Sequence, residues 1–148
     1  MATIRLEIVT PEKMLVREDV DEVVVPGEEG YLGVLPGHTP LLATLQVGEL
    51  WYRVGQEKHY LAVAFGFVEV LPDRVTVLAQ IAERAQEIDV ARAEAAKRRA
   101  EERVARAPQA SAGSSAAGSP DLDFERARIA LAKSLLRLQV ASRARTRV

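Results

Sequence analysis

Residues 82–107 read AERAQEIDVARAEAAKRRAEERVARA, and this stretch divides the chain into two halves of different character. It is dense in residues with high helix propensity, and no glycine or proline interrupts it before Pro108. Small side chains recur along it at spacings of three and four residues: Ala93, Ala96, Ala100 and Val104. This narrow seam predicts a helix whose backbone approaches another helix closely.

The chain before residue 82 carries a β pattern. TIRLEIV (residues 3–9) alternates apolar and charged side chains, and VDEVVVPGEEG (20–30) is a β-branched run that ends in a Pro-Gly turn. ELWYRVGQEKHYLAVAFGFVEV (49–70) predicts a hairpin around Gly55-Gln56, and LPDR (71–74) predicts a turn before another strand. Many short strands with closely spaced turns are typical of a sandwich or a flattened barrel. GYLGVLPGHTPLLA (30–43), with its glycines and prolines, predicts tightly folded loops.

The chain after residue 107 predicts a linker and a second helix. PQASAGSSAAGSP is rich in Ser, Gly and Ala, which indicates a flexible linker over about residues 106–121. DLDFERARIALAKSLLRLQVASRARTRV follows, with an apolar stripe expected from these residues: Leu131, Leu135, Leu138, and Ile129 and Leu136 alongside.

The predicted fold is therefore α+β with segregated halves. Residues 1–85 form an all-β sandwich, and residues 86–148 form an antiparallel two-helix hairpin. A two-helix hairpin buries little surface, so we expect it to be marginal alone and to lean on the sandwich, a partner or a ligand. The architecture thus indicates a movable element.

Charge is divided unevenly between the halves. Residues 1–85 carry 7 Lys+Arg against 13 Asp+Glu, a balance of −6, whereas residues 86–148 carry 13 against 8, a balance of +5. A basic half suits nucleic acid, an acidic protein surface or a phosphorylated small molecule. The absence of cysteine excludes disulfides and thiolate metal sites. No signal-peptide pattern is present, and the apolar run LAVAFGFVEV is too short to cross a bilayer, so we expect a soluble, intracellular chain.

The sequence gives little support for catalysis. His38 is the one candidate general base in the 30–43 stretch, but no Ser, Cys or carboxylate pattern nearby completes a site with it. No GxxxxGK[ST] phosphate loop and no metal-binding cluster appears in the sequence. We therefore predict a protein that is not an enzyme and needs no metal, and any bound nucleotide should be held without hydrolysis.

Several of these stretches together resemble the epsilon subunit of F-type ATP synthases. They are GYLGVLPGHTPLLATLQVGEL, the opening IVTPEKMLVREDVDEVVVPGEEG, GFVEVLPDRVTVLA, AERAQEIDVARAEAAKRRAEER and FERARIALAKSLLRLQVA. The resemblance implies a sandwich of about ten strands followed by two helices. It also implies a non-catalytic subunit of the central stalk of a proton-translocating enzyme, bound to the gamma subunit and resting on the ring of c subunits. Membrane contact would then be indirect, at the cytoplasmic face of the cell membrane.

The resemblance also assigns an interface at the foot of the sandwich. The matching region is Gly30–Leu42, and the candidate residues for contact with gamma and the c-ring are Glu28, Glu29, Tyr31 and His38. Relatives often carry an acidic residue where this chain has Tyr31. The adjacent Glu28 and Glu29 are candidates to meet basic c-ring loops instead.

The hexapeptide IDVARA (88–93) resembles the ATP-binding signature of bacterial epsilon subunits. The resemblance implies a regulatory ATP site formed by six residues: Glu83, Asp89, Arg92, Arg99, Lys133 and Arg137. Arg92 and Arg99 are seven residues apart on one helix, and the two cations of the second helix are four apart, so each pair shares a face. A triphosphate would neutralise such a cluster through charge-assisted hydrogen bonds.

One departure and several alternatives accompany this ATP hypothesis. Nucleotide-binding relatives usually have arginine where this chain has Lys133, and lysine lacks the planar fork, so weaker affinity is expected. Alternatively, Asp89 is a helix N-cap and the arginines are solvated. The first reading predicts an ATP sensor and the second a purely structural subunit. From another class, a basic hairpin suits a nucleic-acid-binding module, although neither helix has an aromatic or purely basic face, so the favoured reading has no nucleic-acid partner.

The resemblance finally implies a switch. Folded on the sandwich, the hairpin is compatible with turnover; extended along gamma, it would place basic side chains against acidic loops of the alpha and beta catalytic subunits and block ATP hydrolysis. The basic side chains are Arg126, Arg128, Lys133 and Arg137. ATP binding only to the folded state would shift the population towards it.

Overall fold

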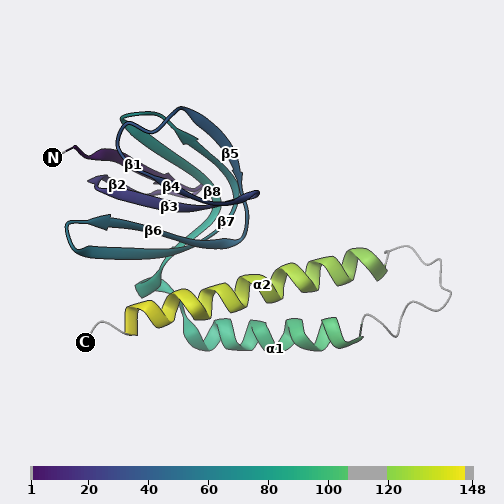
Figure 1. The fold of residues 1–148 in the computed structure, drawn as a ribbon. Helices are drawn as coiled ribbons and strands as arrows, with labels where there is room; N and C mark the ends of the chain where they lie inside the picture. The colour runs from purple at the N-terminus through teal and green to yellow at the C-terminus, as the bar shows by residue number, and fades with distance from the viewer. Residues whose placement is uncertain (1, 107–119, 146–148) are drawn as a thin grey trace.

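The computed structural model describes residues 2–106 and 120–145, and it consists of a β-sandwich followed by two antiparallel helices, as the sequence predicts (Figure 1). The elements in chain order are β1 (Ile4–Val9), β2 (Met14–Val20), β3 (Glu22–Gly27), β4 (Gly30–Val34), β5 (Leu41–Leu45), β6 (Gly48–Val54), β7 (Glu57–Val70), β8 (Arg74–Arg84), the short 3-10 helix η1 (Ala85–Glu87), α1 (Val90–Arg106) and α2 (Pro120–Arg145).

The sandwich has eight strands in the described residues, and two of them belong to both layers. The first part of β7 pairs with β6, and its last part pairs with β5. β8 follows β7 through both layers and also pairs in parallel with β1. One layer has the strand order β2-β1-β8-β7-β5. The facing layer has the order β4-β3-β6-β7-β8, so β7 and β8 are counted in both. This double membership reconciles eight continuous strands with the number of about ten that the resemblance implied.

The core follows from strict alternation along the strands. In β1, Ile4, Leu6 and Ile8 are fully buried while the residues between them are not. Their partners across the layers are mostly valines and leucines, which suit a pleated, buried surface. Each large side chain of this kind stabilises the fold by roughly 1.5–3 kcal/mol relative to an exposed one. The sandwich therefore has a core of its own.

The change of layer occurs at Phe65-Gly66 in β7. Both residues have positive φ, 61° and 121°. The β7–β8 pairing keeps one register on both sides of this point, from Leu61 opposite Arg84 to Val70 opposite Val75. A Cβ at Gly66 would lie 1.9 Å from the carbonyl oxygen of Leu78, so only glycine fits at this corner.

Two turns match their predictions, and one predicted loop region does not. The β6–β7 hairpin turns at Gly55-Gln56, and Gly55 has a φ of 62°. Leu71 and Arg74 exchange backbone hydrogen bonds at the β7–β8 turn. The prediction of loops throughout residues 30–43 was wrong, because β4 occupies Gly30–Val34 and β5 begins at Leu41. Among the described residues β4 pairs with β3 alone, and an edge strand tolerates glycine more readily than a central one does.

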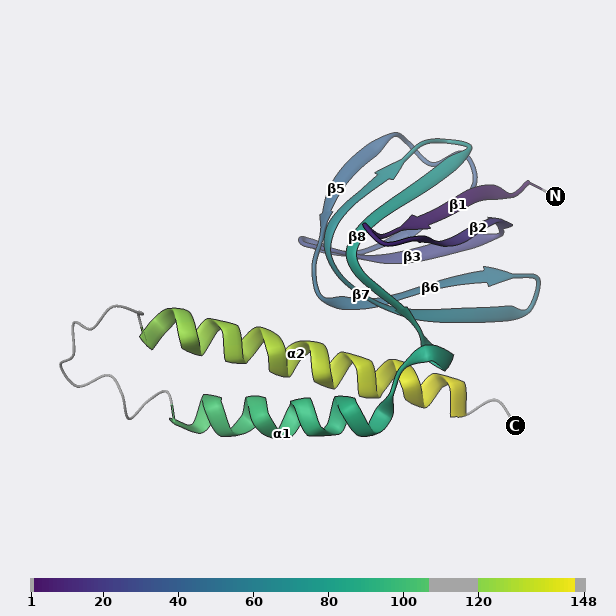
Figure 2. The ribbon, with the colours of Figure 1, turned by 180° about the vertical axis from the view of Figure 1, so that it is seen from behind.

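The start of the helical half also lies later than the composition suggests. Residues 82–84 belong to β8, where Glu83 pairs with Ala62, and η1 then leads into α1 (Figure 2). The guanidinium of Arg84 donates to the carbonyl oxygen of Leu15 at 2.7 Å, which fixes the end of β8 to the sandwich. Pairing across the sheet overrides the helix propensity of this short segment.

The helices pack through small side chains, as predicted. Ala93 and Ala100 of α1 are buried, and so are Ala127 and Ser134 of α2, which are seven positions apart. The Ser134 hydroxyl donates to the carbonyl oxygen of Ala130 at 2.9 Å, so it is satisfied within its own helix. Small residues on both sides allow close approach of the two backbones.

A second face of α2 packs on the sandwich, and the sequence pattern did not predict this face. Val140 is fully buried with Ala141, Ala62, Ala85 and Ile88. The predicted stripe was wrong in part, because Leu135 is 46% exposed. Since α2 lies between α1 and the sandwich, its buried positions are divided between two faces and do not form one leucine stripe (Figures 1 and 2).

The predicted linker, residues 106–121, falls mostly on residues 107–119, outside the described residues. The helices extend slightly into the predicted range, because Arg106 is the last residue of α1 and Pro120 is the first of α2. Proline is favoured at the first helical position, where its missing N–H costs no hydrogen bond. No helix of the described residues is long and apolar enough to span a bilayer.

Candidate functional site

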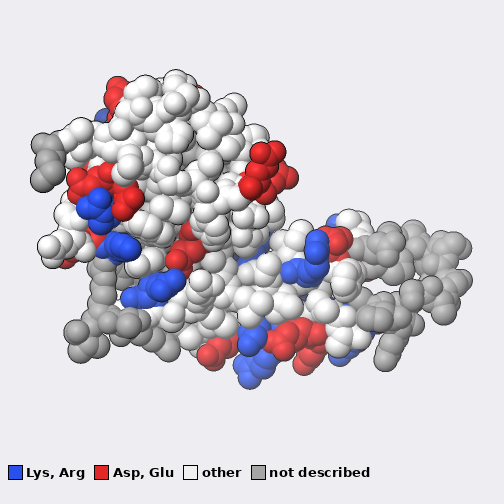
Figure 3. All heavy atoms as spheres, viewed as in Figure 1, with Lys and Arg blue, Asp and Glu red and all other residues white. Residues whose placement is uncertain are grey.

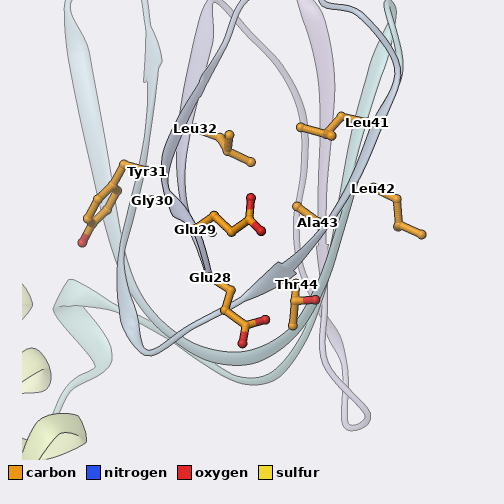
Figure 4. A pocket seen from close by; sticks show the side chains of 10 residues that line it. Glu28, Glu29, Gly30, Tyr31, Leu32, Leu41, Leu42, Ala43 and Thr44 are labelled. Carbon is orange, nitrogen blue, oxygen red and sulfur yellow. The ribbon is translucent and has the colours of Figure 1, made fainter.

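The first candidate region is a cleft at the β3–β4 turn. The cleft has a volume of about 480 Å³ and lies between this turn and β5 (Figure 4). Glu28, Glu29 and Tyr31 line it, together with the aliphatic side chains of Leu32 and Leu41. The backbone N–H of Glu28 donates to the carbonyl oxygen of Thr44 at 2.8 Å, which holds the turn against β5. The cleft thus combines two exposed carboxylates with apolar walls.

His38, the fourth predicted interface residue, does not line this cleft. It lies in the β4–β5 loop, where its Nδ1 is 2.6 Å from the carbonyl oxygen of Thr39 and is assigned as the donor. The neighbouring Gly37 N–H donates to the carbonyl oxygen of Pro72, which ties the loop to the β7–β8 turn. The structure therefore brings three of the four predicted interface residues together and places His38 on an adjoining loop.

An exposed apolar patch on the β5, β7 and β8 surface was not predicted. Leu42, Phe67 and Leu78 are 69%, 53% and 52% exposed, and we call them the apolar patch. Phe67 and Leu78 are cross-strand partners, and Leu42 is paired with Glu69, two residues along the same face. Adjacent exposed large apolar side chains are typical of an interaction surface. A signal for this patch was present in the sequence. In a strand with one buried face, alternation predicts polar residues at the outward positions, but here those positions are apolar.

The second candidate region lies where α2 meets the sandwich. Nε of Arg137 lies 2.7 Å from Oε1 of Glu83, and both side chains are about 30% exposed. Nζ of Lys133 lies 5.3 Å from the ring centre of Phe65, which is a cation–π contact. Three of the six predicted ATP residues therefore meet at one point. The cleft between them has a volume of only about 10 Å³, so a nucleotide would have to move α2 to enter.

The other three predicted ATP residues lie at and along α1. Oδ1 of Asp89 accepts a hydrogen bond from the backbone N–H of Arg92 at 3.1 Å, so Asp89 caps the helix. The side chains of Arg92 and Arg99 are on the exposed surface of α1. The helix-cap alternative is thus present in the structure, and it is compatible with a further role for Asp89.

The segment that connects the two halves begins at a polar cluster around the buried side chain of Tyr52. Burial raises the pKa of the Tyr52 phenol above its ordinary value of 10.0, and a hydrogen bond with Glu18 adds to the rise, while Arg84 opposes it. The Tyr52 ring stacks on His59 with the ring centres 4.8 Å apart. Because Arg84 is the last residue of β8, this cluster anchors the sandwich side of the connection.

The distribution of charged side chains bears on two kinds of site, a nucleic-acid interface and a metal site. Along α1, basic and acidic side chains alternate on the face seen in Figure 3, whereas the sandwich is mostly uncharged there apart from separate groups of acidic and basic side chains. Lys97 and Glu101 form one of the pairs within α1, at 3.7 Å. A nucleic-acid interface ordinarily has a continuous basic face. Within residues 2–106 and 120–145, no group of three His, Asp or Glu side chains is placed to hold a metal ion.

Comparison with protein families gives two adjoining matches. Residues 3–85 match the family described as ATP synthase, Delta/Epsilon chain, beta-sandwich domain. Residues 86–142 match ATP synthase, Delta/Epsilon chain, long alpha-helix domain. The two matches adjoin between residues 85 and 86.

Individual relatives agree with this result. The ATP synthase epsilon chain of Syntrophobacter fumaroxidans is 51% identical over 140 residues, which cover 95% of this chain and 96% of that one. That of Koribacter versatilis is 55% identical over 102 residues, which cover 69% and 72%. Among solved structures, a chain of the Euglena gracilis mitochondrial ATP synthase matches with a TM-score of 0.74 at 22% identity, covering 98% of this chain and 82% of that one. A chain of the Tetrahymena thermophila mitochondrial ATP synthase central stalk/c-ring matches with a TM-score of 0.61 at 15% identity, covering 95% and 97%. The two structural matches support the fold.

Proposed function

Because this chain belongs to the ATP synthase delta/epsilon family, we propose that it is a non-catalytic rotor subunit that binds gamma and the c-ring and restrains ATP hydrolysis through its helical hairpin. The observation that carries the proposal is the match of both halves to epsilon-chain domains in the expected order. One structural neighbour is a chain of a central stalk and c-ring assembly, which agrees with a place in the rotor. The complex, and not this chain, would contact the membrane, at its cytoplasmic face.

The sandwich offers two surfaces for the two rotor partners. We assign the cleft with Glu28, Glu29 and Tyr31 to the c-ring, because two carboxylates beside apolar walls suit a basic loop that also has aliphatic side chains. We assign the apolar patch to gamma, since a permanent partner covers exposed apolar residues better than solvent does. A subunit held at both surfaces would transmit torque between gamma and the ring.

The hairpin suits a two-position element. Its contact with the sandwich combines a small apolar cluster around Val140 with ion pairs that include Glu83–Arg137. Partly exposed ion pairs contribute little stability and re-form readily with other partners. In an extended position, Arg126, Arg128, Lys133 and Arg137 would face acidic loops of the alpha and beta subunits. The docked structure described above would be the position that permits turnover.

ATP would favour the docked position by binding at the α1–α2–sandwich junction. Glu83, Lys133 and Arg137 already meet there, and Asp89 caps α1 nearby in sequence. A bound triphosphate would take Arg137 and Lys133 as partners, together with Arg92 and Arg99 of the same hairpin, after a small shift of α2. ATP with no affinity for the extended form would shift the population by its full binding free energy.

The test is ATP titration of the isolated chain. We expect millimolar ATP to raise the midpoint of thermal unfolding of the hairpin and to slow amide exchange in α1 and α2, with no release of phosphate. Arg92→Ala should abolish both effects. Arg98→Ala removes a neighbouring exposed cation outside the candidate set and should retain them, which makes it the matched control.

Each other result has a defined meaning. If the parent chain shows no change at millimolar ATP, the sensor role is wrong, and a purely structural rotor subunit remains. If Arg92→Ala and Arg98→Ala weaken the response equally, binding depends on general positive charge and not on the assigned site.

A further inference from the structure

One charged residue among those described is buried, and it belongs to none of the sites above. Glu49 of β6 is 8% exposed. A buried carboxylate is costly unless it is paired and hydrogen-bonded. Its partner is Arg143, which lies 94 positions later in the chain. Nη2 and Nε of Arg143 lie 3.3 and 3.4 Å from the two carboxylate oxygens of Glu49. Arg143, near the end of α2, therefore pairs with a buried carboxylate of the sandwich.

An aromatic ring completes the arrangement. The guanidinium of Arg143 lies 5.1 Å from the ring centre of Tyr60 on β7, in a cation–π contact. Tyr60 in turn packs against the buried cluster that contains Val140 and Ala141 of α2. We call Glu49, Tyr60 and Arg143 the clasp. It has one carboxylate, one ring and one bidentate cation, and these come from three separate elements.

The clasp lies beside the connection between the two halves. A small cleft of about 60 Å³ is lined by Tyr60 and Arg143 and also by Ala85 and Gln86 of η1. Residues 85–89, which we call the hinge, are the only covalent connection from β8 to α1. Ala85 and Ile88 of the hinge share the apolar cluster of Val140 and Ala141. A rotation about the hinge that carries the end of α2 off the sandwich therefore separates Arg143 from Glu49 and Tyr60.

We propose that the clasp restrains the hinge and keeps the hairpin docked when no nucleotide is bound. This inference rests on the part of the proposed function in which the hairpin moves, but it does not involve ATP. The clasp residues are distinct from the six ATP candidates, and Arg143 lies six positions beyond Arg137 on α2. Two separate sets of contacts would thus hold α2 against the sandwich. A bound nucleotide can change the contacts near residues 133–137, but it does not reach those of residue 143.

The clasp is suited to release as well as to restraint. The Arg143 side chain is 45% exposed, and its hydrogen bonds to Glu49 are long. After separation Glu49 would have to be hydrated, because a buried carboxylate without a partner is costly. Salt would also weaken the partly exposed pair. A partly exposed ion pair contributes little stability, so a competing partner can displace Arg143.

The experiment uses the full chain, which contains no cysteine. Spin labels attached through Asp73→Cys and Gln139→Cys, both at exposed positions, would report the distance from the sandwich to α2 by pulsed electron resonance. Without nucleotide, we expect the docked distance to predominate in the labelled parent, with a minor undocked population. Arg143→Ala should increase the undocked population about tenfold, and Arg143→Lys should give an intermediate value, because lysine keeps the charge and loses the fork.

Two further variants make the result specific. Arg5→Ala breaks an arginine–aspartate pair that lies within the sandwich, at 2.8 Å, and should leave the distance unchanged. Glu49→Gln should release the hairpin as Arg143→Ala does. Circular dichroism of each variant checks that the sandwich remains folded. Adding ATP to Arg143→Ala should restore the docked distance, since all six candidate residues are intact.

The outcomes separate this inference from the proposed function. If Arg143→Ala and Glu49→Gln retain the docked distance while Arg137→Ala loses it, the clasp is wrong and the mobile hairpin stands. If Arg143→Ala undocks but ATP does not restore docking, the clasp is right and the ATP sensor is wrong. If no variant moves the labels, even at high salt, the mobile hairpin fails, and the clasp fails with it.

Discussion

The sandwich and the hairpin achieve burial with different side chains. The sandwich core consists of residues such as Leu50, Leu61 and Tyr52, each at most 1% exposed. The seam between the helices consists of alanines and Ser134. A large aliphatic side chain contributes roughly 1.5–3 kcal/mol on burial, whereas one methyl group contributes about 0.8 kcal/mol. The sandwich therefore has the means to stand alone, and the hairpin depends on what it is docked against.

The two halves also differ in how they are connected. The sandwich strands pair with partners distant in sequence, as β1 does with β8, so no single contact decides its structure. The hairpin is attached through the hinge and one face of α2. A substitution in the sandwich should affect the whole molecule, while one in the hairpin should affect the hairpin alone. The following predictions test this contrast.

Gly66→Ala should have the largest effect. The added Cβ would lie 1.9 Å from the carbonyl oxygen of Leu78, and the φ of 121° is unfavourable for any residue but glycine. Because this corner carries β7 from one layer to the other, we expect the free energy of unfolding of the sandwich to fall by about 4 kcal/mol. Urea denaturation followed by circular dichroism measures it.

Gly33→Ala is the matched control. A Cβ at Gly33 meets nothing within 4 Å, so the same chemical change should alter the stability by less than about 0.5 kcal/mol. Equal losses for the two variants would show that the corner is not a special position.

Val140→Ala should have a smaller and more local effect. Val140 is fully buried between α2 and the sandwich, and removing two methyl groups should cost the hairpin roughly 2 kcal/mol. We expect faster amide exchange throughout α1 and α2, with the exchange of the sandwich strands unchanged. Leu135→Ala on the same helix removes a larger but 46% exposed side chain and should change neither. Faster exchange in the sandwich as well would mean that the halves unfold as one unit.

Asp89→Ala should cost about 1 kcal/mol, because the backbone N–H of Arg92 loses its acceptor. The effect should be confined to the first turn of α1 and appear as faster exchange of the Arg92 amide. Asp89→Asn keeps a side-chain acceptor and should retain most of the protection. Loss of protection along the whole of α1 would instead indicate that Asp89 supports the docking of the hairpin.

The fold was largely predictable from the sequence because the two halves obey different local rules. Alternation in residues 3–9 and the turn residues at 55–56 and 71–74 each specify local geometry, and the alanine spacing specifies a helix seam. The strand β4 was missed because Gly30 and Gly33 obscure its pattern, and an edge strand has only one partner to enforce pairing. The second face of α2 was missed because burial there is shared with charged side chains such as Arg137.

The candidate site was predictable only in part. The resemblance assigned Glu83 and Arg137 to one site. In the structure, Nε of Arg137 lies 2.7 Å from Oε1 of Glu83. Their proximity could not be deduced from spacing, since 54 residues separate them and the docking of α2 decides it. The pair of Glu49 and Arg143 had no sequence signal, because an isolated glutamate in a strand and an arginine near the chain end are ordinarily solvated.

The smallest predicted effect concerns the start of the hinge and appears only at alkaline pH. Burial, followed by the hydrogen bond with Glu18, raises the pKa of Tyr52 above its ordinary value of 10.0, so the folded chain holds this proton more tightly than the unfolded chain does. The resulting stabilisation is complete below pH 10.0 and is lost as the pH rises through the raised pKa. Tyr52→Phe should change the neutral stability by only about 0.5 kcal/mol, through the lost hydrogen bond. It should also lessen the decline in stability above pH 10.0, measured by urea denaturation at a series of pH values. Parallel declines in the variant and the parent would show that this phenol does not couple ionisation to folding, and the anchor at the end of β8 would then depend on Arg84 and its hydrogen bond to Leu15.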